Sequence, residues 1–534
     1  MLQVSLFDWF LSDESVRIFN IEANYDFLGS VSKFLDNNFG NGLEICDMLL
    51  LLPNRRSVNA LRSVFLKASR GGARFTPTLK AIGDIDEEAI VLSGADPDLL
   101  QEYLKSIKTR SSTGYRLLLL REILFSDNHS SVEQAIGLSK GLDAFLADVE
   151  SYEIGFDRLE NLVDEDLAIH WQRILDFLRN FGAKWHGLLN DNGLTSAQSR
   201  RVANIRFYEK LLRKAKPKNP VLMVGNFDPL GSTLDLMEAM SWHDNTYILF
   251  KGLDNGLTDK EFAAVDELNS HFFIKKTLEK LGLRREQVVN LAYPDCRTIP
   301  DRALHTLHTA LLPSDLTHRW QKNSAIGKLE HIQYIECRDL DDELNVLMVY
   351  LLDHIACNGL GNIALVAGQE LSQRLELLLE HWNIPFNNTY GKKFLFHPVV
   401  RYLMLLLEIY NENYRPSKLL CLLKNNFTYF GYPKEKFLRN VHLFEKYILE
   451  DRINRSGMES YRVNTSYLED EQTREELTEF LDRIEDYFSI FSKKNFPLEE
   501  LVLDHLELAE KIASSPGTDG ANVLWHSDES SEKV

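Results

Sequence analysis

The feature that most constrains the fold is an unbroken apolar run at residues 48–52, which ends at Pro53 and leads directly into a helical pattern. Such a run is typical of a strand that is covered on both faces in a parallel sheet. Beyond it, apolar residues recur at spacings of three and four between positions 58 and 68, which predicts a helix with one buried stripe. We therefore expect a strand followed by a helix, the repeating unit of an α/β fold.

This helix carries cations where helices usually carry acids. Seven basic residues and no acidic residue lie between positions 48 and 83. Arg55 and Arg56 fall in the first turn, where the helix dipole disfavours each positive side chain by roughly 0.3 to 1 kcal/mol. An external anion would reverse that cost. The pattern therefore fits either a phosphate track at the carboxyl edge of the sheet or a solvated basic helix face.

Length, charge and cysteine content narrow the class of protein. A chain of 534 residues predicts three or four domains. A net charge of −19 excludes a histone-like coat of nucleic acid, so any contact with nucleic acid must use local basic tracks. The five cysteines are widely spaced and form no CxxC pair, so neither a disulfide framework nor a zinc site is expected.

The chain is expected to be soluble and cytoplasmic, without membrane contact. It holds no apolar run near the roughly 20 residues that a membrane span needs. Its first residues carry an early Asp8 and no leading Lys or Arg, unlike a secretory signal.

The pattern of apolar periods divides the chain into two α/β parts, each with a helical insertion. Strands are expected at 16–21, at 48–52, within 76–90, at the start of 221–231, and at 246–254, 331–338 and 362–368. The expected domains are a first α/β domain (1–96 and 216–325), a helical insertion (97–215), the start of a second α/β domain (326–397), a second helical insertion (398–512) and a frayed tail (513–534). Two strands alone do not make a stable sheet, so the second α/β part looks unfinished.

This outline is that of a superfamily-one helicase, which makes an ATP site the first chemistry to look for. The pattern GxxxxGK[ST] is absent, and the segment after the first expected strand offers neither a glycine-rich cradle nor a lysine for phosphates. Residues 225–232 (GNFDPLGS) lie between a strand and a helix but hold no lysine, and Pro229 has no N–H to donate. We favour a structural turn there, and we expect no cofactor in this chain.

A rival interpretation is a noncanonical ATPase or a Mg²⁺-dependent nuclease that uses Asp84, Asp86 and Glu87. It predicts thermal stabilisation by nucleotide or Mg²⁺. A run of acids in a loop is more often a solvated helix cap, so we expect no metal site. A third alternative is a degenerate gene product without a DNA role.

Several segments, read in order, resemble the AddB family, the helicase-like and nuclease-bearing subunit of the AddAB double-strand break repair complex, in its alphaproteobacterial form. The segments that carry the resemblance are 49–66 (LLLLPNRRSVNALRSVFL), 76–90, 164–178, 220–237 (PVLMVGNFDPLGSTLDLM), 248–254, 336–352 and 362–386. The resemblance implies a P-loop-NTPase-like parallel sheet, related to superfamily-one helicases, that has lost its Walker A loop.

The resemblance implies that this chain is a non-motor, non-catalytic portion of a complex that would as a whole be an ATP-dependent helicase and exodeoxyribonuclease. Its implied partners are the AddA helicase-nuclease subunit, double-stranded DNA ends and single-stranded DNA. With this family in view, we favour the phosphate track over the solvated face. The residues expected to contact DNA are Asn54, Arg55, Arg56, Asn59, Arg62, Lys67 and Arg70.

Three further expectations follow. A second basic track, favoured as a solvated face, comprises Arg200, Arg201, Arg206, Lys210, Arg213, Lys214 and Lys216. Arg374 matches an arginine that reaches toward the γ-phosphate in helicases; without a P-loop, it is expected to be a vestige of a nucleotide site or a surface salt bridge. Relatives also carry a PD-(D/E)xK nuclease, but this sequence has no such motif, so it resembles an amino-terminal portion without nuclease activity.

Overall fold

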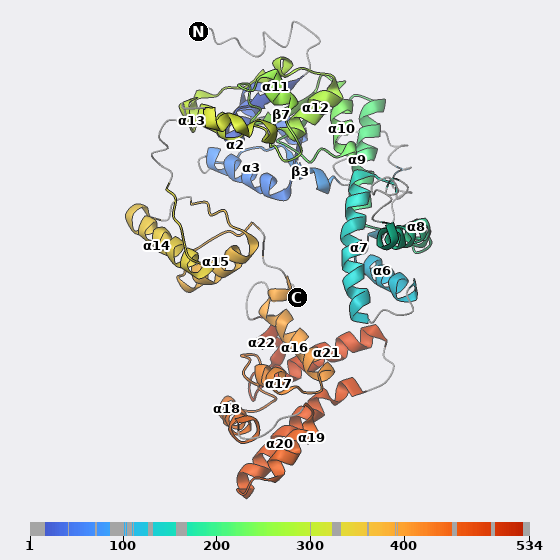
Figure 1. Cartoon of the computed structure of the whole chain (residues 1–534), viewed down its shortest axis with the longest axis vertical. Helices are drawn as coiled ribbons and strands as arrows, with labels where there is room; N and C mark the ends of the chain where they lie inside the picture. The colour runs from blue at the N-terminus through green and yellow to red at the C-terminus, as the bar shows by residue number, and fades with distance from the viewer. Residues whose placement is uncertain are drawn as a thin grey trace. The chain divides into compact units, whose positions relative to one another are not determined.

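The structure is a computed structural model of the chain and forms two compact units, Met1–Ile332 and Gln333–Val534. Figure 1 shows the course of the chain through both units, coloured from the N-terminus to the C-terminus. The residues described are 17–40, 42–69, 72–85, 101, 103, 109–110, 112–126, 132–155, 158, 168–299, 301–322, 333–359, 363–389, 391, 394–450, 456–492 and 497–526.

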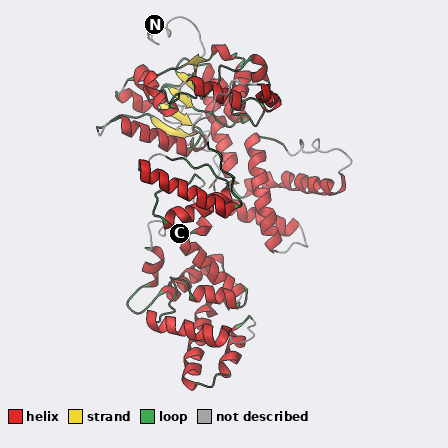
Figure 2. Ribbon diagram, turned by 60° about the vertical axis from the view of Figure 1, so that its left-hand side comes forward, coloured by secondary structure: helices red, strands yellow, loops and turns green. Residues whose placement is uncertain are grey.

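The first unit is built on a six-stranded sheet in the order β3-β2-β6-β7-β1-β8, with every neighbouring pair parallel. Figure 2 shows these strands enclosed by helices. The strands are β1 (Ile18–Ile21), β2 (Leu49–Leu52), β3 (Thr78–Ala81), β6 (Val221–Val224), β7 (Thr246–Lys251) and β8 (Val289–Asn290). The prediction of an α/β fold is confirmed, and five of these strands fall where the sequence predicted them.

Both faces of this sheet are covered by helices. One face packs against α2 (Phe27–Phe39) and α3 (Arg55–Ala68), and the other against α9 (Ala197–Lys214), α10 (Gly231–Ser241) and α12 (Phe272–Leu281). In β2, Leu50 and Leu52 join the core under α2 and α3, whereas Leu49 and Leu51 join the core on the other face. Every position of the strand is buried, which explains the unbroken apolar run in the sequence.

Between β3 and β6 the chain forms a helical segment of α6 (Ser112–Ser126), α7 (Val132–Tyr152) and α8 (Ala168–Asp191) around the buried Trp185. A short parallel pair of strands, β4 (Thr109–Arg110) and β5 (Leu194–Thr195), closes it. The helix α9, which we expected within this insertion, instead packs on the sheet. The reason is its apolar stripe, in which Tyr208 and Leu212 are almost fully buried in the sheet core.

The first unit also contains α11 (Asp259–Ala263), between β7 and β8 along the chain, and α13 (Asp301–Ala310), after β8. In the second unit, α14 (Leu340–Asn358) and α15 (Gln369–His381) pack through a small leucine-rich core that includes Leu344, Leu351 and Leu379.

The strands expected at 331–338 and 362–368 are not formed in the described residues of these segments, 333–338 and 363–368. Residues 333–337 and 363–368 are irregular, and the second unit has no strand among its described residues. Tyr334 is 87% exposed and Val366 fully exposed, so these apolar side chains are not covered. The physical reason is that two short apolar runs cannot form a sheet without further strands to pair with them.

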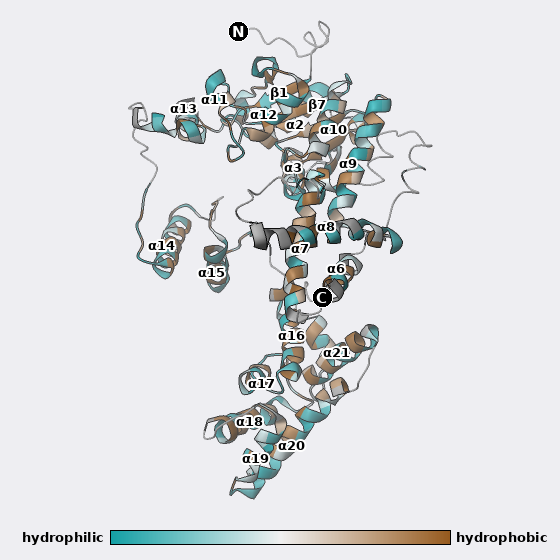
Figure 3. Ribbon diagram, turned by 45° about the vertical axis from the view of Figure 1, so that its right-hand side comes forward, coloured by the Kyte–Doolittle hydropathy of each residue, from teal (hydrophilic) through white to brown (hydrophobic). Residues whose placement is uncertain are grey.

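The rest of the second unit is helical in its described part, with α16 (Pro398–Asn411), α17 (Pro416–Leu423), α18 (Lys434–Phe444), α19 (Met458–Ser466), α20 (Glu471–Phe488), α21 (Leu498–Ala513) and α22 (Gly520–Trp525). These helices carry both apolar and polar residues along their length (Figure 3). Their apolar sides meet in one core, in which Tyr402, Phe444 and Phe480 are fully buried.

The prediction of a frayed tail from residue 513 is wrong for the described part of that segment. The helix α22 packs on α21: Leu524 is fully buried, and the Trp525 indole N–H donates to Glu510 at 2.7 Å. The small residues that suggested fraying allow this contact, because a Cβ at Gly520 would overlap the carbonyl of Glu510. The last residues, 527–534, lie outside the described part.

Candidate functional site

A basic cavity of about 770 Å³ lies beside β3, the outermost strand on one side of the sheet. Its charged lining consists of five cations and, among the described residues, a single carboxylate: Arg55, Arg62, Lys80, Arg200, Arg201 and Asp84. We call this the basic cavity. Its size lies within the range of ordinary ligand pockets, and its charge is opposite in sign to that of the chain as a whole.

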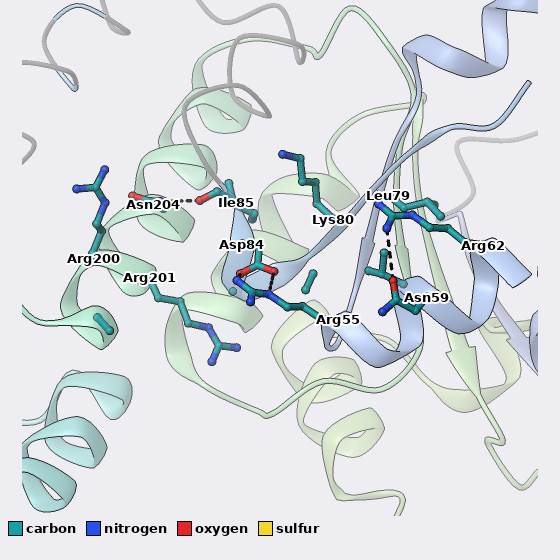
Figure 4. A pocket seen from close by; sticks show the side chains of 14 residues that line it. Arg55, Asn59, Arg62, Leu79, Lys80, Asp84, Ile85, Arg200, Arg201 and Asn204 are labelled. Atoms are coloured by element: carbon teal, nitrogen blue, oxygen red, sulfur yellow. Dashed lines mark hydrogen bonds and ion pairs between the residues drawn. The ribbon is translucent and has the colours of Figure 1, made fainter. Parts of the chain in front are cut away.

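Three segments supply these charges (Figure 4). The helix α3 contributes Arg55 and Arg62, the strand β3 contributes Lys80, and the first turns of α9 contribute Arg200 and Arg201. The helices α3 and α9 cover opposite faces of the sheet, so their cations meet only where the sheet ends, next to β3. The structure thus joins the start of the second basic track to the first one.

The start of α3 is fixed by Asn54. Its side-chain oxygen accepts from the backbone N–H of Ser57 at 2.9 Å and from the Ser57 hydroxyl at 3.1 Å, so Asn54 is the N-cap of the helix. The cap lets α3 begin directly after β2 and Pro53. As a result Arg55 and Arg56 occupy the first turn, as the sequence predicted, and point to different cavities.

Arg55 makes a two-pronged ion pair with Asp84 from the turn after β3. Its Nε lies 2.6 Å from Asp84 Oδ2, and its Nη2 lies 2.9 Å from Oδ1. The hydrogen bonds from Arg55 hold the pKa of the Asp84 carboxyl below its usual range, with smaller contributions from the charges of Lys80 and Arg201. The sequence predicted an external anion at this helix start, but the chain supplies one of its own.

This pairing argues against the rival in which Asp84 binds Mg²⁺. Both carboxylate oxygens already accept from one guanidinium, and further cations lie close by. The other two acids of that proposal, Asp86 and Glu87, lie outside the described residues. Within the described part of the chain, no group of three or more potential metal ligands comes together.

Arg201 lies against Gly83, close enough to Asp84 to lower the pKa of that carboxyl. Its Nε is buried and, within the described residues, has no hydrogen-bond partner. A Cβ at Gly83 would lie 3.0 Å from that nitrogen, so the absence of a side chain at Gly83 leaves room for the Arg201 side chain. A buried guanidinium nitrogen without a partner is unusual, and it lies at the wall of the basic cavity.

Three further cations of the second basic track form ion pairs with carboxylates of the first unit. Arg206 pairs with Glu153, Glu209 and Asp235, Arg213 with Glu209 and Glu238, and Lys216 with Asp244. These carboxylates neutralise the cations and join α9 to α7 and α10. The Glu153 hydrogen bonds, above all, raise the pKa of the Arg206 guanidinium. The solvated face that we expected is therefore an ion-pair network at Arg206, Arg213 and Lys216, whereas Lys210 and Lys214 are exposed, as expected.

The remaining predicted DNA contacts are divided among several places. Asn59 and Arg62 line the basic cavity, and Arg62 Nη1 donates to Asn59 Oδ1 at 3.4 Å. Lys67 is exposed in the last turn of α3, outside the lining of the cavity. Arg70 lies outside the described residues.

Asn54 and Arg56 line a second cavity, of about 1190 Å³, at the carboxyl ends of β1, β2, β6 and β7. This is where open α/β sheets ordinarily bind ligands. The loop after β1 lines it with Glu22 and Asp26 instead of a glycine-rich turn with lysine. We call this the carboxyl-edge cavity, and its lining gives no phosphate cradle of the P-loop kind.

The turn at residues 225–232 also has a structural explanation. Gly225 has φ of +109°, and a Cβ there would lie 3.2 Å from the Pro53 ring, so only glycine fits without strain. The Asn226 side chain bonds the backbone N–H and carbonyl of Lys251, at 3.1 and 2.9 Å. These contacts fasten the end of β6 to the end of β7, which agrees with our preference for a turn over a nucleotide loop.

Arg374 lies on α15 in the second unit and is engaged in surface ion pairs. Its Nη1 lies 2.7 Å from Asp341 Oδ1, and its Nη2 lies 3.0 Å from Glu370 Oε1. The two carboxylates are largely exposed and the Arg374 side chain about half exposed. Arg374, which the resemblance matched to a phosphate-contacting arginine, is therefore paired with two acids of the chain.

Comparison with known proteins adds no relative to this description. Neither the models of known protein families nor the curated proteins give a match to the chain. Of the helices that the structure describes, none combines the length and the apolar character that crossing a bilayer would require.

Proposed function

We propose that this protein is the helicase-like, non-motor portion of an AddAB-type complex, in which it binds DNA strands at double-strand ends for recombinational repair. The observation that carries the proposal is the basic cavity, where five cations from α3, β3 and α9 converge in a chain of net charge −19. Concentrating positive charge in one place on an acidic protein favours a polyanion that contacts several cations at once.

The proposed fold relationship is to P-loop NTPases that have lost the phosphate loop. In support, β1 lies inside a parallel sheet, and the loop after it opens into the carboxyl-edge cavity beside the ends of β6 and β7. A P-loop enzyme has its glycine-rich loop after such a strand. The acidic residues found there instead favour a subunit that binds the strand while AddA supplies ATP hydrolysis.

The strand-binding role can be tested through its salt dependence. If Arg62, Lys80, Arg200 and Arg201 each neutralise one phosphate, log K should fall with log[salt] with a slope of about −2.8 for single-stranded DNA. Affinity should then fall about 50-fold between 50 and 200 mM salt. Fluorescence anisotropy with a labelled oligothymidylate measures both quantities.

A double variant, Arg62→Ala with Arg200→Ala, should weaken binding and reduce the slope to about −1.4. The matched control is Lys210→Ala with Lys214→Ala, which removes two exposed cations of the same helix α9 outside the cavity. If both double variants lower the affinity and the slope equally, binding depends on surface charge in general, and the role of the cavity is refuted. Co-purification with AddA would support the proposed complex, and its failure would count against it.

A further inference from the structure

We propose that Asp84 is a built-in competitor for the phosphate backbone, so that a strand enters the basic cavity by exchanging this carboxylate for one of its own phosphates at Arg55. The inference rests on the proposed function and adds a residue that sets its affinity. Asp84 would then be a specificity-determining residue and not a metal ligand.

The geometry of the pair matches the way in which arginine holds a phosphate. A guanidinium binds carboxylates and phosphates alike through two parallel N–H donors. Arg55 presents such a fork to Asp84, with distances of 2.6 and 2.9 Å. The carboxylate therefore occupies the position in which one phosphate of a bound strand would make the same two hydrogen bonds.

The pair is also placed where exchange is easy. The Arg55 side chain is 81% exposed and that of Asp84 is 34% exposed, so solvent and ligand reach the contact. An exposed ion pair contributes little net free energy and is screened by salt. Arg55 belongs to the first turn of α3, where the helix dipole favours keeping an anion nearby at all times.

The remaining charges of the cavity explain why a strand would displace Asp84 and a single phosphate would not do so readily. Lys80 and Arg201 lie near enough to Asp84 to lower its pKa, so they also attract any incoming anion. A ligand with several linked phosphates can contact Lys80, Arg201 and Arg55 at the same time, whereas an isolated phosphate has only one group with which to compete with Asp84. The carboxylate thereby favours nucleic-acid strands over small anions.

The test removes the competing charge without removing a cation. In Asp84→Asn, affinity for a labelled oligothymidylate at about 0.1 M salt should rise roughly two- to fivefold, in line with the small net worth of an exposed pair. The slope of log K against log[salt] should steepen by about 0.7, because in the wild type the displaced Asp84 carboxylate still neutralises one of the five cations, whereas in the variant all five are left for phosphates. Adding Arg55→Ala to this variant should abolish both changes.

The matched control is Asp244→Asn, which removes the same charge from an exposed ion pair with Lys216, outside the lining of the cavity. It should leave the slope unchanged. Melting curves establish that each variant is folded, and Asp84→Ser replaces Asp84→Asn if that variant is not.

The outcomes separate this inference from the proposed function. If the wild-type chain binds the strand and Asp84→Asn behaves as Asp244→Asn does, or binds more weakly, the competitor role is overturned while the strand-binding role stands. Binding by Asp84→Asn but not by the wild type would support the competitor role. If neither protein binds, both proposals fail.

Discussion

Replacing Asn20 by Ala should measurably destabilise the first unit, because this residue joins three parts of it. Asn20 lies in β1 and is fully buried. Its Nδ2 donates to the carbonyl of Leu253 at 3.0 Å and to Asn290 Oδ1 at 2.9 Å, and its Oδ1 accepts from the Leu253 N–H at 2.9 Å. One side chain thus connects β1 with β8 and with the turn that follows β7.

The size of the effect follows from what the change leaves behind. Alanine removes three hydrogen bonds, each worth about 1 kcal/mol net, and leaves the N–H and C=O of the buried Leu253 without these partners. We expect a loss of about 3 kcal/mol. For a unit of 332 residues, an unfolding entropy of about 2.1 cal/mol/K per residue gives roughly 0.7 kcal/mol/K, so Tm should fall by roughly 4 °C.

Differential scanning calorimetry measures the shift, and hydrogen exchange read by mass spectrometry assigns it to the first unit. The matched control is Asn192→Ala, which removes an exposed amide that donates to the Leu188 carbonyl at 2.8 Å. Its effect should stay below about 0.5 kcal/mol. A loss below about 1 kcal/mol for Asn20→Ala, or equal losses for both variants, would refute the reasoning that this buried network stabilises the sheet.

Two further predictions concern stability. Burial lowers the pKa of His271 in the first unit and of His505 in the second. The unfolded chain therefore takes up protons first as pH falls below about 6.5, and the free energy of unfolding should drop by up to about 1.4 kcal/mol per pH unit per histidine until each folded-state pKa is reached. Melting curves between pH 8 and 5 should show this loss, and His505→Gln should reduce it; an unchanged pH dependence would contradict the assignment. Glu209 is 9% exposed and forms ion pairs with both Arg206 and Arg213. Urea unfolding of Glu209→Ala should therefore show a free energy of unfolding that is roughly 2 kcal/mol lower. No loss would mean that the other acids of the network are enough to neutralise both arginines.

The positions of the strands in the first unit could be predicted because each signal is local. A strand buried on both faces has apolar side chains along its length, and β2, β6 and the middle of β7 (residues 247–250) show this as continuous runs. The start of α3 was equally readable, since the apolar run ends at Pro53 and a helical pattern follows directly; the cap by Asn54 came only from the structure. The sequence also showed that no P-loop follows β1, because that motif consists of consecutive residues.

The apolar runs of the second unit misled the same reasoning. Residues 363–368 have the composition of a strand, but a strand forms only when a neighbour pairs with it, and none does so among the described residues. The tail was misread for a related reason. Gly520 looks like a helix breaker in the sequence, and only the packing of α22 on α21 shows that it permits a close contact.

The sequence by itself determined that the chain has an α/β sheet, a basic helix at the end of its second strand, and no phosphate loop. Only the tertiary structure decided which cations act together. Charge interactions depend on distance in space, and the sheet order brings Arg200 and Arg201 of α9 to the edge where Arg55, Arg62 and Lys80 lie. The same folding brings Asp84 to Arg55, so the chain itself supplies an anion at the place where the sequence predicted an external one.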